Sequence, residues 1–151
     1  MSEFKIISIN ISKEKGTIKT AIEEALLKED HGIIGDAHAG DWHRQISLLA
    51  EEDIDTMREA IKNKSDVELN PGIFAENITT EGVLLSDLSV GTKIIIDNTE
   101  LEVTQIGKEC HHGCEIFQKV GFCVMPKKGI FAKVIKGGKI KIGSLGKVIF
   151  P

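Results

Sequence analysis

The sequence predicts a mainly β domain, a barrel or sandwich of many short strands with a few short helices. Three observations support this class. Short stretches rich in β-branched residues recur along the chain. Turn-forming pairs such as Asp97-Asn98 and Gly137-Gly138 separate several of them. Only residues 51–62 show a clear helical apolar stripe. With 151 residues and 41% hydrophobic residues, the chain is expected to form one domain over 1–151.

The expected elements follow from these patterns. Strands are expected at residues 4–11, 46–49, 73–80, 93–96, 101–106, 130–136, 139–142 and 148–150. The pairs Asp97-Asn98 and Gly137-Gly138 each predict a hairpin between their flanking strands. The helix over 51–62 carries acidic residues in its first turn and Ile54, Met57 and Ile61 on one face.

Three further segments complete this expectation. Residues 30–45 are polar and contain glycines, and they predict a long loop. Residues 115–120 are expected to form one helical turn. Residues 17–28 are ambiguous, because their local propensity favours a helix while a strand leading into the loop fits equally.

Composition excludes several classes of function. The net charge is −4, and Arg44 and Arg58 are the two arginines of the sequence, so binding to nucleic acid by bulk charge is not expected. The first residues are charged and no apolar run is long enough to span a bilayer, so we expect neither a secretory signal nor a membrane segment. Three cysteines do not form a disulfide framework. We therefore expect a cytoplasmic protein with reduced thiols, and its oligomeric state stays open.

The side chains that can bind ligands gather in two polar segments. The first contains His31, His38 and His43 with Trp42 and Arg44, and the second contains His111 and His112 with Cys110, Cys114 and Cys123 close by. Both segments adjoin predicted strands. Loops on a rigid scaffold commonly build sites, so we expect the two segments to meet in one pocket.

The second segment, residues 105–114, predicts a reactive thiol at Cys110. A thiol reacts or binds a soft metal as the thiolate, and Lys108, His111 and His112 are placed to stabilise that negative charge. Alternatively, a free cysteine can be a small buried apolar group, an interpretation that applies more to Cys123 than to Cys110. The spacing also permits a zinc site, although it lacks paired Cys-x₂-Cys knuckles.

The first segment, residues 32–47, predicts an anion-binding loop. Arg44 offers a planar fork suited to phosphate, and His38 and His43 add donors. Gln45 offers an amide for the edge of a heterocycle. The alternative is a solvated loop in which Asp36 or Asp41 pairs with Arg44. In a third segment, residues 71–82, Glu76 and Asn77 either line the pocket or cap a chain turn.

Together these stretches resemble the MOSC domain, the C-terminal module of molybdenum cofactor sulfurases, which also occurs as small bacterial proteins. The resemblance lies in GDAHAG at 35–40 running into HRQISLL at 43–49, in PGIFAENITTEG at 71–82, and in VGT at 90–92 followed by LEVTQ at 101–105 and the Cys110 loop. The closing residues 125–132 and Gly137-Gly138 are also similar to short bacterial members.

The resemblance implies a Greek-key-like MOSC β-barrel and a cysteine that carries sulfane sulfur or ligates molybdenum. The matching position is Cys110. The cofactor would be molybdopterin-bound molybdenum, transient or resident, and the residues expected to bind it are His38, His43, Arg44, Gln45, Asn77, Lys108 and His111. The pyridoxal-phosphate half of the sulfurases is absent from this sequence, so direct binding of pyridoxal phosphate is not expected. A separate cysteine desulfurase or a molybdoenzyme is the expected partner.

Three hypotheses of function follow. The first is a molybdenum cofactor-binding and sulfur-carrier protein that uses Cys110. The second, from other relatives of the domain, is a small molybdenum-dependent reductase of N-hydroxylated compounds. The third is a non-catalytic binding module whose cysteine loop is stabilised by zinc. The sequence alone leaves open whether the protein is an enzyme.

Overall fold

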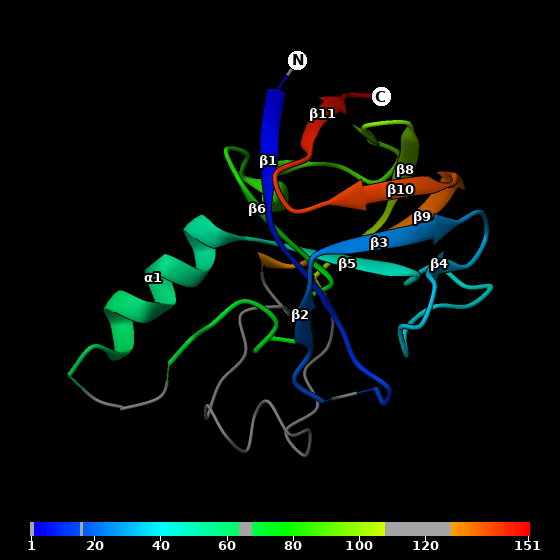
Figure 1. The fold of residues 1–151 in the computed structure, drawn as a ribbon. Coiled ribbons are helices and arrows are strands. Elements are labelled where there is room, and N and C mark those ends of the chain that lie inside the picture. The colour runs from blue at the N-terminus through cyan, green and yellow to red at the C-terminus, as the bar shows by residue number, and fades with distance from the viewer. Residues whose placement is uncertain (1, 16, 64–67, 108–127) are drawn as a thin grey trace.

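The structure, a computed structural model, describes residues 2–15, 17–63, 68–107 and 128–151. Within these ranges it contains eleven strands, one α-helix and one 3₁₀ turn (Figure 1). In chain order they are β1 (Ser2–Ile11), β2 (Thr20–Ile22), β3 (Glu24–Lys28), β4 (Gly32–Ile33), β5 (Ile46–Ala50), α1 (Glu51–Ile61), β6 (Ile78–Glu81), η1 (Leu85–Asp87), β7 (Lys93–Ile96), β8 (Thr99–Ile106), β9 (Ile130–Lys136), β10 (Gly138–Lys141) and β11 (Leu145–Ile149).

Seven of the described strands close into a barrel. Their order is β11-β7-β8-β9-β5-β6-β1, and β1 pairs back with β11, which places Ser2 opposite Val148 and brings the two chain ends together (Figure 1). Strands β5 and β6 run parallel, which requires a crossover, and the segment containing α1 supplies it. The prediction of a mainly β, barrel-like domain is confirmed.

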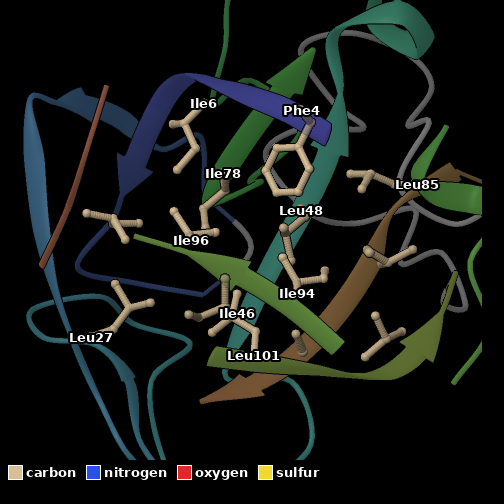
Figure 2. Packing of buried hydrophobic residues seen from close by; sticks show 14 of the residues in the cluster. Phe4, Ile6, Leu27, Ile46, Leu48, Ile78, Leu85, Ile94, Ile96 and Leu101 are labelled. Carbon is tan, nitrogen blue, oxygen red and sulfur yellow. The ribbon is translucent and has the colours of Figure 1, made fainter. Parts of the chain in front are cut away.

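Apolar side chains, mostly aliphatic, fill the barrel (Figure 2). The figure labels Phe4, Ile6, Leu27, Ile46, Leu48, Ile78, Leu85, Ile94, Ile96 and Leu101, all of which belong to one buried cluster. A second small sheet, β10-β3-β4, contributes Leu27, Ile33 and Ile140 to the same cluster and so packs against the barrel. Burying each such side chain contributes about 1.5–3 kcal/mol.

An irregularity in β1 decides which of its side chains enter the core. The pairing of β1 with β6 shifts between Ile6 and Ser8, so one extra residue interrupts the alternation. Phe4 and Ile6 therefore face the core before the shift, and Ile9 faces it afterwards. Ser8 and Asn10 consequently share the opposite face, where Ser8 Oγ donates to Asn10 Oδ1 at 2.7 Å.

Helix α1 packs in a second apolar cluster, as its stripe predicted. The buried members are Leu49, Ile54, Leu69, Ile73, Phe74, Ala75 and Phe131, with Ile18, Met57 and Ile61 packed against them. Because Leu48 belongs to the barrel cluster and Leu49 to this one, β5 is buried on both faces. None of the described helices is long and apolar enough to cross a bilayer.

The helical interpretation of residues 17–28 is wrong. This stretch forms β2 and β3, and Ala25 and Leu27 alternate into the core while β3 pairs with β10. Burial in a sheet outweighs the small difference in helix propensity between these residues. The strand expected over 73–80 begins only at Ile78, because Ala75 has a positive φ of 64° that interrupts extended backbone.

The two predicted hairpins have different outcomes. The hairpin at Asp97-Asn98 is confirmed, with Ile96 paired to Thr99. The one at Gly137-Gly138 is wrong, because β9 pairs with β5 and β8 whereas β10 pairs with β3. Position 137 requires glycine because its backbone passes close to the backbone of β3. A Cβ at Gly137 would lie 2.5 Å from the carbonyl oxygen of Leu27. The helical turn expected at 115–120 lies outside the described residues.

The contact between β1 and β11 that closes the barrel leads to a prediction about the stability of the fold. Phe4 pairs with Gly146, and a Cβ at Gly146 would overlap the buried Phe4 ring. We expect Gly146→Ala to lower the free energy of unfolding by about 1–3 kcal/mol through overpacking, measured by urea denaturation. The exposed neighbour Lys147→Ala serves as the control and should have little effect. Adding Phe4→Leu should recover part of the loss, and additive effects of the two changes would contradict the contact.

Candidate functional site

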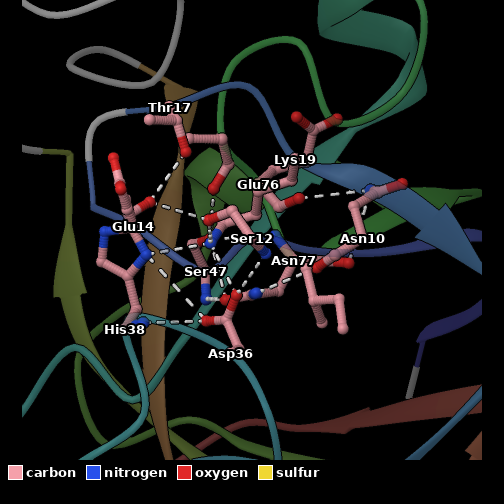
Figure 3. Close-up of polar contacts among 12 residues, drawn as sticks. Asn10, Ser12, Glu14, Thr17, Lys19, Asp36, His38, Ser47, Glu76 and Asn77 are labelled. Carbon is pink, nitrogen blue, oxygen red and sulfur yellow. Dashed lines mark hydrogen bonds and ion pairs between the residues drawn. The ribbon is translucent and has the colours of Figure 1, made fainter.

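A buried lysine lies at the centre of a polar cluster beside the first predicted site loop (Figure 3). The Lys19 side chain is fully buried, and its Nζ donates to Asp36 Oδ1 at 2.7 Å and to Ser12 Oγ at 3.0 Å. The same Nζ lies 3.0 Å from His38 Nδ1. A buried ammonium is tolerated when a carboxylate and further acceptors surround it, and these three residues supply them.

Asp36 connects this lysine to the loop that follows it. Its Oδ1 accepts the Ser12 N–H at 3.1 Å, and its Oδ2 accepts the His38 N–H at 3.0 Å. Burial alone would raise the pKa of Asp36, but the hydrogen bond and charge of Lys19, with smaller contributions from Asn77 and Ser12, hold that pKa below its ordinary value. Asp36 is therefore ionised at neutral pH, and it fixes the end of β1 and the 36–38 loop to one point.

A layer of amides lies next to this ion pair. Asn77 Oδ1 accepts the Ser47 N–H at 2.9 Å, and Asn77 Nδ2 donates to the Asn10 carbonyl at 3.1 Å. Asn10 Nδ2 lies 3.3 Å from Thr79 Oγ1. These bonds join β1, β5 and β6 on the polar face that the shift in β1 creates. The side chain of Asn77 is completely buried, and its role toward a cofactor stays a prediction.

Glu76 caps the turn that precedes β6. Its fully buried carboxylate accepts the Phe74 N–H at 3.3 Å and the Thr79 hydroxyl at 2.9 Å. Burial raises the pKa of Glu76, and the hydrogen bonds from the turn only partly offset this effect. Of the two roles considered for Glu76, the structure shows the capping role.

Arg44 joins the first predicted site loop to the strand that leads into the second. Its Nε donates to Gln105 Oε1 at 3.1 Å, and its guanidinium carbon lies 5.2 Å from the centre of the Phe131 ring. Thr104 donates to the carbonyl of His43. The pairing of β8 with β9 shifts between Val103 and Gln105, and such bulges often redirect a side chain near a site. The first loop therefore contacts the strand end from which the second loop starts, and a pocket shared by the two loops stays a prediction.

Arg44 has no carboxylate partner among the described residues. The alternative in which Asp36 or Asp41 pairs with Arg44 is wrong, because Asp36 pairs with Lys19 and Asp41 is exposed with no ion pair in the described ranges. Arg58 shows the contrasting case, since its guanidinium bonds Glu51, Asp55 and the Leu69 carbonyl. Arg44 is half-buried, and among the described residues its hydrogen-bond partner is reached through Nε and not through the terminal nitrogens.

The other predicted residues of the first loop differ in exposure. His43 is exposed and meets Trp42 edge-to-face, with ring centres 5.7 Å apart. Lys15 Nζ lies 4.4 Å from the centre of the Trp42 ring. Gln45 is buried, and its Oε1 accepts the Val134 N–H at 2.9 Å, so this oxygen serves the fold. Contacts of His43 and Gln45 with a ligand stay predictions.

Cys110, the predicted metal ligand, lies outside the described ranges. The same is true of its neighbours Lys108, His111 and His112 and of the other two cysteines, Cys114 and Cys123. The described chain approaches them at Gly107, whose N–H donates to the Gly129 carbonyl at 2.7 Å. No group of three or more His, Cys, Asp or Glu side chains in the described ranges is arranged to hold a metal ion. The metal-ligand role of Cys110 therefore stays a prediction.

Sequence reasoning missed the residues that support the site. Lys19 lies in the segment 17–28, which the sequence left open between helix and strand, and it directly precedes β2. Thr104 and Gln105 are parts of an ordinary strand pattern, and their importance depends on a one-residue shift in pairing. A lysine among apolar and β-branched neighbours was the one signal present in the sequence.

Residues 35–145 of the sequence match the MOSC domain family. The chain belongs to the MOSC domain family. The matched range includes the 35–47 loop, the Cys110 loop and most of the barrel. MOSC domains are associated with binding of the molybdenum cofactor.

Solved structures share the MOSC barrel at low sequence identity. The YuaD protein from Bacillus subtilis is 18% identical with a TM-score of 0.79, over 98% of each chain. YiiM from Geobacillus stearothermophilus is 20% identical with a TM-score of 0.72, over 97% of this chain and 75% of that one. YiiM from Escherichia coli is 18% identical with a TM-score of 0.67, over 100% of this chain and 71% of that one. These likenesses support the fold. No curated protein sequence gave a significant match.

The buried Lys19–Asp36 pair leads to a prediction about how the free energy of unfolding depends on pH. Asp36→Asn leaves the Lys19 ammonium buried without its counter-charge, so we expect a loss of about 3–5 kcal/mol of unfolding free energy at pH 7. Because the pKa of Asp36 is lowered by folding, its stabilisation is present above 3.8, its unfolded value, and disappears as pH falls through the lower folded value. The difference between wild type and variant should therefore shrink below pH 3.8.

Chemical denaturation of both proteins across this pH range checks the prediction. Asp41→Asn is the matched control, because Asp41 is exposed on the same loop. Equal losses in the two variants at pH 7, or a constant difference down to acid pH, would show that the Lys19–Asp36 pair does not stabilise the fold.

Proposed function

We propose that this MOSC domain binds the molybdenum cofactor between the 35–47 loop and the loop that begins at Gln105, and that Cys110 serves as molybdenum ligand or persulfide carrier. Family membership supports binding of the cofactor. The single observation that carries the placement is the contact between Arg44 and Gln105, which joins the two predicted loops at their roots.

The charge of Arg44 supports an anionic ligand. A half-buried guanidinium usually pairs with a carboxylate, as Arg58 does with Glu51 and Asp55. Arg44 has no such partner among the described residues, and Phe131 and Gln105 hold its guanidinium in place. A planar fork fixed in this way suits the phosphate of molybdopterin, because arginine binds phosphate through parallel hydrogen bonds.

The described residues fit the organic part of the cofactor. Arg44 would hold its phosphate, and His38 and exposed His43 would add ring donors to the same anionic group. Gln45 and Asn77 would act mainly by shaping the walls, because their carbonyl oxygens are engaged by Val134 and Ser47. When bound, the cofactor supplies a soft metal centre that accepts sulfur ligands.

The metal would be held from the second loop. A thiolate is the ligand type that a molybdenum–dithiolene centre favours, and Cys110 is the cysteine with polar and cationic neighbours, Lys108 and His111. As a persulfide carrier, Cys110 would pass its outer sulfur to an acceptor and return to the thiolate. A cysteine desulfurase would then be the partner that supplies sulfur, and a molybdoenzyme the partner that receives it.

The two arginines of the sequence provide a matched test of the anion site. We expect Arg44→Ala to retain the cofactor about tenfold to a hundredfold less well than wild type, because a charge-assisted hydrogen bond contributes roughly 1.5–3 kcal/mol. The measurement is the ratio of pterin to protein after purification from a host that makes the cofactor.

Arg58→Ala is the control for that test. Arg58 lies on α1 and is neutralised by Glu51 and Asp55, so its loss should change stability but leave the pterin ratio unchanged. Normal retention by Arg44→Ala, or an equal decrease in both variants, would remove Arg44 from the site.

The thiol has its own pair of variants. We expect Cys110→Ser to lose bound molybdenum or, in the carrier case, to lose the sulfane sulfur released by cyanide treatment, because serine provides no thiolate. Cys123→Ser should retain both. Metal analysis and sulfane-sulfur assay measure the two outcomes, and equal loss in both variants would contradict the assignment of Cys110.

A further inference from the structure

The contact between Lys19 and His38 defines where the imidazole carries its hydrogen. Lys19 Nζ lies 2.7 Å from the ionised Asp36 carboxylate and 3.0 Å from His38 Nδ1. Paired with that carboxylate, Nζ is an ammonium, which has three donors and no lone pair. The hydrogen between Nζ and Nδ1 therefore belongs to the lysine, and Nδ1 is the acceptor.

The opposite tautomer, with hydrogen on Nδ1, does not fit the described contact of that nitrogen with Lys19. The carboxylate oxygen Asp36 Oδ2 lies 4.0 Å from Nδ1, beyond hydrogen-bond distance. That oxygen already accepts the His38 N–H at 3.0 Å. A hydrogen on Nδ1 would instead point at the Lys19 ammonium at 3.0 Å, where two donors would face each other.

The backbone holds the ring in this orientation. The His38 N–H is bonded by Asp36, and the His38 carbonyl accepts the Trp42 Nε1–H at 2.7 Å. The side chains of Lys19 and Asp36 are fully buried, whereas 17% of the His38 side chain is exposed. Nδ1 of the ring therefore faces the buried ion pair, while part of the His38 side chain remains accessible to solvent.

We propose that Lys19 is a positioning residue that holds His38 as the neutral tautomer with hydrogen on Nε2, so that His38 donates a hydrogen bond to an oxygen acceptor of the ligand. An acceptor of this kind is a phosphate or carbonyl oxygen, and its assignment to the molybdenum cofactor rests on the proposed function. With Nδ1 accepting from Lys19 and Nε2 protonated, neither ring nitrogen offers a lone pair to a metal. His38 is a donor to the ligand and not a metal ligand.

Nitrogen NMR of the whole protein labelled with ¹⁵N-histidine reads the tautomer directly. We expect the His38 ring to show an unprotonated Nδ1 and a protonated Nε2 at neutral pH, while exposed His43 shows averaged signals of exchanging tautomers. His38→Asn assigns the His38 signals by removing them. A protonated Nδ1, or averaged signals like those of His43, would overturn the proposal.

Lys19→Met tests the positioning role. Without the ammonium, the His38 signals should move toward the averaged values, whereas a purely structural lysine would leave the tautomer unchanged. Unchanged signals in folded Lys19→Met would therefore exclude the role of Lys19. If that variant does not fold, the wild-type spectrum still decides the tautomer.

Two substitutions of His38 separate support of the fold from ligand binding. His38→Asn keeps an oxygen acceptor for Lys19 but lacks the Nε2 donor, whereas His38→Leu lacks both. We expect a near wild-type melting temperature for His38→Asn and a clearly lower one for His38→Leu, with reduced pterin content in both. Full pterin content in His38→Asn would contradict the donor role. Absence of pterin from wild type would contradict the proposed function and leave the tautomer result standing.

Discussion

The polar side of this barrel depends on one buried ion pair, Lys19 with Asp36. Two charges removed from water are stable only when each finds several partners, and here the partners come from different segments of the chain. The ammonium binds the turn after β1 through Ser12, and the carboxylate binds the backbone of the 36–38 loop. Because all these bonds converge on one point, the site loop has a defined shape on a strand scaffold. The amides of Asn10 and Asn77 extend the same network into β5 and β6.

Two cations of this region have opposite surroundings, and the difference separates scaffold from site. Lys19 is buried and neutralised by Asp36, so its charge is used within the fold. Arg44 is half-buried between Phe131 and Gln105 and has no carboxylate partner among the described residues. An oriented charge that the described part of the fold does not neutralise is what an anion-binding site requires. Arg44 contacts Gln105 at the root of the Cys110 loop, so the proposed anion site would lie beside the proposed thiol.

Periodic patterns predicted much of the barrel, because strands such as β1, β7 and β8 alternate or cluster apolar residues that the core buries. The patterns failed where tertiary contacts decide the outcome. Residues 17–28 have helix-forming side chains but contain β2, which pairs with β1, and β3, which pairs with β10. The Gly137-Gly138 pair carries the chain between two sheets instead of turning it back.

In the site, the sequence identified Arg44 and His38, whose chemistry is visible in their side chains. It did not identify Lys19 or Gln105, because their roles come from packing and from a shift in strand pairing.

The measurement that tests the account most directly is the metal and pterin content of the wild-type protein, purified from a host that makes the molybdenum cofactor. The account predicts molybdenum and pterin in equal amounts. Protein without pterin, or with zinc in place of molybdenum, would contradict it.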